Sequence, residues 1–240
     1  MWFEKLGSHL KSIGLQCSTT SPCLFLGTLI EGKASIYVGI YVDDIIYFSP
    51  DDTVEQKFEE MLSTIGDVDF MGQVTHFLGI EFTWYKLPDG HLSVNLTQQS
   101  FSESLLDSLA LPILSTSLYT TPYQSGRSID SIPDQNMSSE ERDQLRLQYQ
   151  SIVGSLNWLA HTTRPDISMA VSLLAQHQST PSLGLLEAAL YVVKYYHRLQ
   201  TWAFILAVQT DLLWRHFFIF LFLQLSFSWL MPTGVLKMHL

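Results

Sequence analysis

Two adjacent aspartates, Asp43 and Asp44, interrupt a run that otherwise has the composition of a buried strand. Residues 40–42 and 45–47 on either side are apolar or aromatic. Burying unpaired carboxylates is unfavourable, so the chain must either expose the pair at a turn or bind cations with it. A hairpin turn is one interpretation, since Asp is a frequent turn residue. Yet tight two-residue hairpins favour Gly or Asn, and neither accompanies the pair.

Chemically, adjacent carboxylates at the edge of a sheet suit nucleotidyl transfer. In that reaction two Mg²⁺ ions about 3.5–4 Å apart activate a primer 3′-hydroxyl and stabilise the leaving pyrophosphate, and hard carboxylate oxygens hold them. Two aspartates from one turn usually need a third carboxylate from another strand. Asp43 and Asp44 are therefore candidate catalytic and metal-binding residues, and the third ligand is left open.

Hydrophobic spacing predicts a mixture of helices and antiparallel strands around this pair. Apolar residues recur at helical spacing over residues 2–13, and Gly14 follows as a natural stop. Three strands are expected at residues 24–30, 35–41 and 45–48, with a turn at residues 31–33. Together they predict a small antiparallel meander.

A second group of elements is expected before residue 110. Asp52 is placed to cap a helix with one apolar face, and Thr97 to cap a short helix that ends at Leu109. Between these helices, strands are expected at residues 75–84 and 91–96 around a turn at residues 87–90.

The second half of the chain changes character twice. Residues 112–139 are dense in Ser, Thr, Pro and Asp without hydrophobic periodicity, which indicates a linker and a boundary. Three helices are expected at residues 139–161, 165–177 and 181–199, the last two with Pro at the first helical position. Residues 217–231 are almost wholly apolar.

Charge and cysteine content limit the classes of function. The formal net charge is -10 with only 13 Lys and Arg, which argues against binding nucleic acid by electrostatics alone. The 2 cysteines make neither a disulfide framework nor a CxxC metal site, and the His residues lack metal-ligand spacing. The first residues are amphipathic, so no secretory signal is expected. An intracellular, reducing setting is the expectation.

A collinear series of short motifs runs through residues 2–167. One of them, Tyr41-Val42-Asp43-Asp44, matches the catalytic YVDD box of the reverse transcriptases of Ty1/copia-type retrotransposons. Around it, four elements resemble those of the family in the expected order: WFEKL at residues 2–6, SPCLF at 21–25, FLGIEF at 77–82 and LTQQSF at 96–101. Two more, YQSIVGSLNWL at 149–159 and TRPDI at 163–167, resemble elements that join the polymerase to its RNase H domain.

This resemblance implies an α+β fold, a partial reverse-transcriptase palm followed by helices of the connection region. It implies RNA-directed DNA synthesis, with Asp43 and Asp44 as ligands of Mg²⁺ and with template-primer RNA or DNA and dNTPs as partners. Phe77, Leu78 and Gly79 would form a primer-grip-like element, although Phe77 and Leu78 also suit ordinary strand packing. The family's setting implies a cytoplasmic particle or the nucleus.

Departures from the family pattern predict an inactive fragment. The first catalytic aspartate and the nucleotide-binding loop of the family lie upstream of WFEKL, so we expect this chain alone to lack polymerase activity. The expected organisation is a partial palm at residues 1–96, a short thumb or connection helix at 97–111, a linker at 112–139, a helical connection region at 140–199 and an out-of-frame tail at 200–240.

Two alternatives concern the tail and the function. Read one base earlier, codons for residues 229–240 can encode ADANWGPQDAS, a family-like RNase H segment, which suggests a frameshift near residues 199–201. The competing interpretation is a membrane anchor at residues 217–231, but that run is shorter than the roughly 20 residues of a typical span, so membrane attachment is not expected. A second functional hypothesis is a non-catalytic remnant that binds a related polymerase or nucleic acid.

Overall fold

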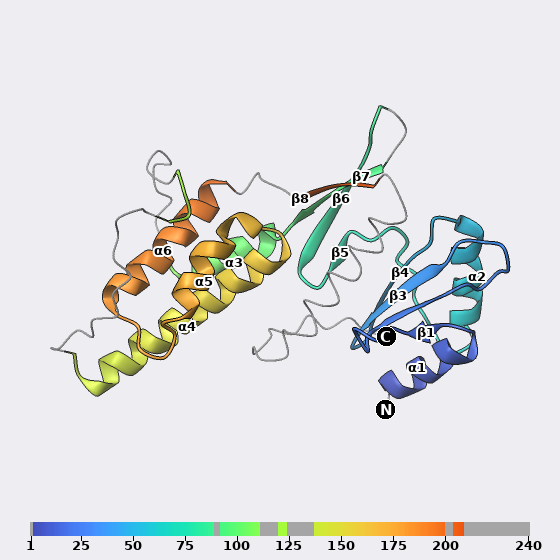
Figure 1. The fold of residues 1–240 in the computed structure, drawn as a ribbon, viewed down its shortest axis with the longest axis horizontal. Helices are drawn as coiled ribbons and strands as arrows, with labels where there is room; N and C mark the ends of the chain where they lie inside the picture. Colours follow the sequence, from blue (N-terminus) through green and yellow to red (C-terminus); the bar gives the residue numbers. More distant parts are fainter. Residues whose placement is uncertain (1, 89–91, 111–119, 124–136, 200–203, 209–240) are drawn as a thin grey trace. The chain divides into compact units, whose positions relative to one another are not determined.

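The structure, a computed structural model, describes residues 2–88, 92–110, 120–123, 137–199 and 204–208. It contains helices and two small sheets (Figure 1), which confirms the α+β class expected from the sequence. The chain divides into two compact units, the first made mainly of Met1–Phe77 and the second of Leu78–Tyr85 with Val94–Leu206. Each unit is described separately.

The first unit opens with helix α1, Trp2–Ser12, as its apolar spacing predicts. Gly14 ends it in a left-handed conformation with φ 98°. The amide of Gly14 donates to Lys11 and that of Leu15 donates to Leu10, the paired hydrogen bonds of a Schellman motif. Leu10 and Leu15 also share the core of this unit, so the helix end is fixed by packing as well as by hydrogen bonds.

The first sheet is an antiparallel meander in the order β1-β2-β3-β4. Its strands are β1 Gln16–Cys17, β2 Leu24–Gly27, β3 Ile36–Tyr41 and β4 Asp44–Phe48. The predicted meander is therefore confirmed. Strand β2 ends three residues earlier than expected, and β1 was not expected at all.

Alternating residues of β3 turn one face of this sheet toward the helices. Ile36, Val38 and Ile40 are fully buried and share a core with residues of α1 and of helix α2, Asp52–Leu62. The prediction that Asp52 caps α2 is wrong by one residue, because the side chain of Asp51 accepts the hydrogen bond from the Thr53 amide.

The second sheet has the order β5-β6-β7-β8. Its strands are β5 His76–Phe77, β6 Ile80–Lys86, β7 Leu92–Thr97 and β8 Phe204–Val208. The single strand predicted at residues 75–84 is wrong, because Leu78 and Gly79 break it. Both have positive φ, 52° and 73°, which is the pattern of a two-residue type I′ turn.

The second unit gathers its helices around one core (Figure 1). They are α3 Gln99–Ser108, α4 Ser139–Thr162, the 3₁₀ turn η1 Pro165–Ile167, α5 Ser168–Ala175 and α6 Leu183–Arg198. Ser138 and Glu141 form a capping box at the start of α4. Pro181 was expected to be the first helical residue of α6. That prediction is wrong, because Ser182 caps the helix and Pro181 precedes the cap.

Leu105 of α3 packs in the same core as Tyr149 and Leu156 of α4. The compact unit therefore includes elements on both sides of residues 112–139. That segment lies mostly outside the described residues, as does the apolar run at 217–231. Among the helices that the structure describes, none is long and apolar enough to cross a membrane.

Candidate functional site

The aspartate pair lies at a tight hairpin turn between β3 and β4. Tyr41 pairs with Asp44 in the ladder, which leaves Val42 and Asp43 as the two turn residues. Val42 has φ 53°, a region that β-branched residues rarely adopt, and its side chain is 67% exposed. Strain of this kind persists where the surrounding structure enforces it and is common at functional sites.

The two carboxylates have no hydrogen bond or ion pair to any other residue that the structure describes. Asp43 is exposed and Asp44 is partly exposed. Burial, and secondly the negative charge of Asp43, raises the pKa of Asp44 above its ordinary value. A divalent cation beside the pair would relieve both effects, so these oxygens fit a hard metal ion.

Among the residues that the structure describes, none supplies a third metal ligand at this turn. Within residues 2–88, 92–110, 120–123, 137–199 and 204–208, no group of three or more His, Cys, Asp or Glu side chains could hold a metal ion. The described part of the site is thus a pair of carboxylates on a hairpin.

Helix α2 supports the hairpin from one side through Tyr47. The Tyr47 ring lies 5.1 Å from that of Phe58, centroid to centroid, and its hydroxyl donates to Glu59. The amide of Ser49, just after β4, donates to Glu55 at 2.8 Å. These contacts fix β4 against α2, and the β3–β4 register then fixes the turn that carries Asp43 and Asp44.

Of the three residues predicted to be primer-grip-like, Phe77 ends β5, and Leu78 and Gly79 form the β5–β6 turn. Phe77 is 7% exposed, Leu78 is partly exposed, and Gly79 is exposed. Leu78 therefore lies in a turn, not in a strand. A role of these residues in seating a primer stays a prediction.

A second polar junction, missed by sequence reasoning, centres on Glu81 of the FLGIEF motif. Its carboxylate accepts hydrogen bonds from Thr97 Oγ1 at 2.7 Å, the Ser100 amide at 2.9 Å and Ser100 Oγ at 2.6 Å. Burial alone would raise the pKa of Glu81, but the Ser100 and Thr97 hydrogen bonds outweigh it and hold that pKa below its ordinary value. Glu81 thus stabilises the exposed amides at the start of α3.

The prediction that Thr97 caps α3 is therefore wrong. Thr97 is the last residue of β7, and the N-cap position belongs to Gln98, whose side chain makes no capping hydrogen bond. Instead, Gln98 accepts a hydrogen bond from Thr163 at 2.8 Å inside the second unit. A carboxylate on β6, and not on the residue next to the helix, provides the hydrogen bonds of a helix cap.

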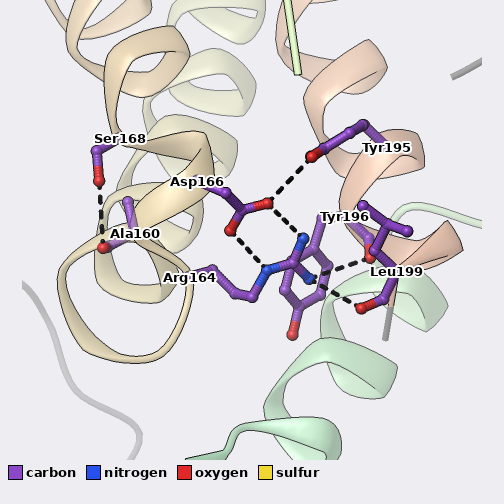
Figure 2. Close-up of polar contacts among 7 residues, drawn as sticks. All are labelled: Ala160, Arg164, Asp166, Ser168, Tyr195, Tyr196 and Leu199. Carbon is purple, nitrogen blue, oxygen red and sulfur yellow. Dashed lines mark hydrogen bonds and ion pairs between the residues drawn. The ribbon is translucent and has the colours of Figure 1, made fainter. Parts of the chain in front are cut away.

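The TRPDI motif forms a buried ion-pair network, shown in Figure 2. Arg164 is 3% exposed and makes two 2.8 Å hydrogen bonds to Asp166, one to each carboxylate oxygen. It also donates to the carbonyls of Tyr196 and Leu199 at 3.4 and 3.3 Å, and its guanidinium lies 4.6 Å from the Tyr196 ring centroid. The motif therefore ties the α4–α5 connection to the end of α6.

Comparison with known proteins places these features in a family. A family model described as "Reverse transcriptase (RNA-dependent DNA polymerase)" matches residues 1–121. The retrovirus-related Pol polyproteins from transposons RE1 and RE2 of Arabidopsis thaliana are 32% and 30% identical over 81% of this chain. That from transposon TNT 1-94 of Nicotiana tabacum is 23% identical, also over 81% of the chain.

The chain spans 12% of the length of the RE1 and RE2 polyproteins. No solved structure matched it. The resemblance read from the motifs is confirmed: the chain belongs to the reverse transcriptase (RNA-dependent DNA polymerase) family and corresponds to part of a Ty1/copia-type retrotransposon reverse transcriptase.

Proposed function

We propose that this chain carries the metal-binding hairpin of an RNA-directed DNA polymerase, with Asp43 and Asp44 as ligands of catalytic Mg²⁺. The observation that carries the proposal is the pair of carboxylates without partners among the described residues, held at the tip of a strained turn in a family of nucleic-acid polymerases. Template-primer and dNTPs are the proposed substrates.

Bound Mg²⁺ would supply activation of a primer 3′-hydroxyl and neutralisation of charge on the leaving pyrophosphate. The chain's own contribution is positional. The β3–β4 register and the Tyr47 contacts with α2 hold the turn, and the turn presents adjacent carboxylates to solvent. A cation bound beside the pair would lower the pKa of Asp44, which burial and secondly the charge of Asp43 raise in the chain without metal.

Binding of Mn²⁺, followed by electron paramagnetic resonance, tests the metal role directly. We expect Asp43→Asn and Asp44→Asn each to weaken Mn²⁺ binding several-fold at neutral pH. Asp67→Asn is the matched control, because Asp67 is also an exposed carboxylate of the first unit and lies outside the hairpin. Equal affinity in all four proteins would refute the assignment.

Primer extension tests whether this chain completes a catalytic site. Two carboxylates from one turn do not make a full two-metal site, so we expect no Mg²⁺-dependent extension of a primed RNA template by the chain alone. Templated synthesis that disappears in Asp43→Asn would overturn this expectation and establish that the chain is an active polymerase.

A further inference from the structure

Two cysteines lie near each other at one end of the β1–β2 ladder. Cys17 is in β1 and Cys23 directly precedes β2, and both are free and partly exposed. Because Cys17 pairs with Phe25 across the β1–β2 ladder, Cys23 is its diagonal neighbour. The register therefore brings the residue that precedes β2 near Cys17.

In a regular ladder the two cysteines would be too far apart to form a disulfide. Diagonal neighbours lie about 7–8 Å apart, whereas the Cα atoms of a disulfide usually lie about 4.4–6.8 Å apart. The chain departs from the ladder here. The Leu24 amide donates to the Ser21 carbonyl at 3.2 Å, which closes a turn with Pro22 and Cys23 as its central residues.

This turn folds back onto Cys17. The Sγ atom of Cys17 lies 3.6 Å from the carbonyl oxygen of Pro22, which belongs to the peptide bond that joins Pro22 to Cys23, and 4.0 Å from the carbonyl oxygen of Ser21. Cys17 Sγ therefore contacts the backbone on which the Cys23 side chain is mounted. Burial, and secondly Cys17, raises the pKa of the Cys23 thiol.

We propose that Cys17 and Cys23 form a redox pair that a low-molecular-weight disulfide, such as oxidised glutathione, converts to an intramolecular disulfide. The Cys17 thiolate attacks one glutathione sulfur, the glutathione disulfide bond breaks, and one reduced glutathione leaves. Cys23 then gives up its proton and attacks Cys17 Sγ, which releases the second reduced glutathione. Two thiols are oxidised, and one glutathione disulfide is reduced to two thiols.

The position of the bond connects it to the candidate metal hairpin. The carbonyl of Cys23 accepts a hydrogen bond from the Ile40 amide at 2.9 Å, and β3, which contains Ile40, ends at the turn that carries Asp43. Closing the 17–23 loop restrains this hydrogen-bonded neighbour of β3. We expect the Ile40 amide to exchange with solvent more slowly in the oxidised chain than in the reduced chain.

Mass spectrometry of the full chain after treatment with oxidised glutathione tests the proposal. The expected product has lost two hydrogens, carries no glutathione and resists alkylation at both cysteines. In Cys23→Ser, which lacks the second thiol, glutathione should remain on Cys17. Cys17→Ser is the reciprocal control and should retain any adduct on Cys23.

Three outcomes would overturn the redox pair. They are stable glutathione adducts on the unsubstituted chain, disulfide-linked dimers as the main product, and two cysteines that both stay open to alkylation. Comparison with the same reaction in concentrated urea adds a test of the fold. If loop closure is slower in the folded chain than in urea, the structure holds the thiols apart and the proposal fails.

Discussion

Replacing Glu81 by alanine should loosen the start of α3, because one carboxylate accepts three hydrogen bonds there. Hydrogen bonds to charged groups contribute about 1.5–3 kcal/mol each when well shielded. Ser100 is exposed and Thr97 is partly exposed, so water and screening reduce that contribution. A lost helix cap alone costs about 0.5–2 kcal/mol. We therefore expect Glu81→Ala to lower local stability by about 2–3 kcal/mol.

Glu81→Gln should have a smaller effect, about 1 kcal/mol, because the amide oxygen can still accept from Ser100 while the charge near the helix start is lost. Glu103→Ala and Glu103→Gln are the matched controls. Glu103 is an exposed residue of α3, and it accepts one hydrogen bond from Gln99 at 2.8 Å.

Amide hydrogen exchange is the suitable assay, because a chain with two compact units need not unfold in one step. The Ser100 amide reports the lost hydrogen bond itself. The Ser102 amide, which donates to the Gln98 carbonyl, reports the first turn of α3. If Glu81→Ala changes these exchange rates no more than Glu103→Ala does, the capping role is refuted.

The same carboxylate gives a pH dependence with a definite sign. The pKa of Glu81 is lower in the folded chain than its ordinary value. The contribution of Glu81 to stability is therefore fully present above its pKa in the unfolded chain, about 4.3, and is lost as the pH falls through its lower pKa in the folded chain. In Glu81→Gln this part of the acid destabilisation should be missing, whereas Glu103→Gln should leave it unchanged.

Three further predictions concern the turn, the ion pair and the second core. Val42→Gly should stabilise the β3–β4 hairpin by about 1 kcal/mol, seen as slower exchange of ladder amides, since glycine adopts φ 53° without strain. Unchanged or faster exchange would contradict the strain. Arg164→Lys should lower the urea unfolding midpoint of the second unit, with a loss of about 2–4 kcal/mol, because lysine cannot replace the two bonds to Asp166. A loss within 0.5 kcal/mol, the usual range for surface sites, would refute it. Tyr149→Phe should cost about 1–2 kcal/mol in the same assay, because the buried Leu174 carbonyl loses its 2.7 Å hydrogen bond. An unchanged midpoint would show that this carbonyl finds another donor.

Local patterns were sufficient where a whole element obeys one periodicity. The apolar spacing before Gly14 predicts α1 and its end, and the alternating residues of β3 predict a strand with one buried face. The two-residue strand β1 could not be predicted this way. Two residues carry no period, and β1 exists because Gln16 and Cys17 pair with β2.

The errors arose where the chain departs from local preference or where the stabilising contact is distant in sequence. Leu78 is a poor residue for positive φ, so no local rule predicts a turn there, yet the chain reverses at Leu78 and Gly79. The cap of α3 comes from Glu81, 19 residues before Ser100. A capping rule that reads only the adjacent residues therefore selects Thr97, which instead donates to that carboxylate.

Hydrogen bonding distinguishes Glu81 and Arg164 from the aspartate pair, although all four residues lie in motifs that resemble those of the family. Glu81 and Arg164 lie in sequences as typical of the family as the YVDD box, but each has its polar groups engaged by neighbours in its own unit. Asp43 and Asp44 have no such neighbours in the described chain, and burial, and secondly the charge of Asp43, raises the pKa of Asp44. The hydrogen bonds of Glu81 and Arg164 give these two residues a role in stabilising the fold. The aspartate pair has no such structural role among the described residues, which is why metal binding, and not unfolding, is the measurement that tests the proposed role.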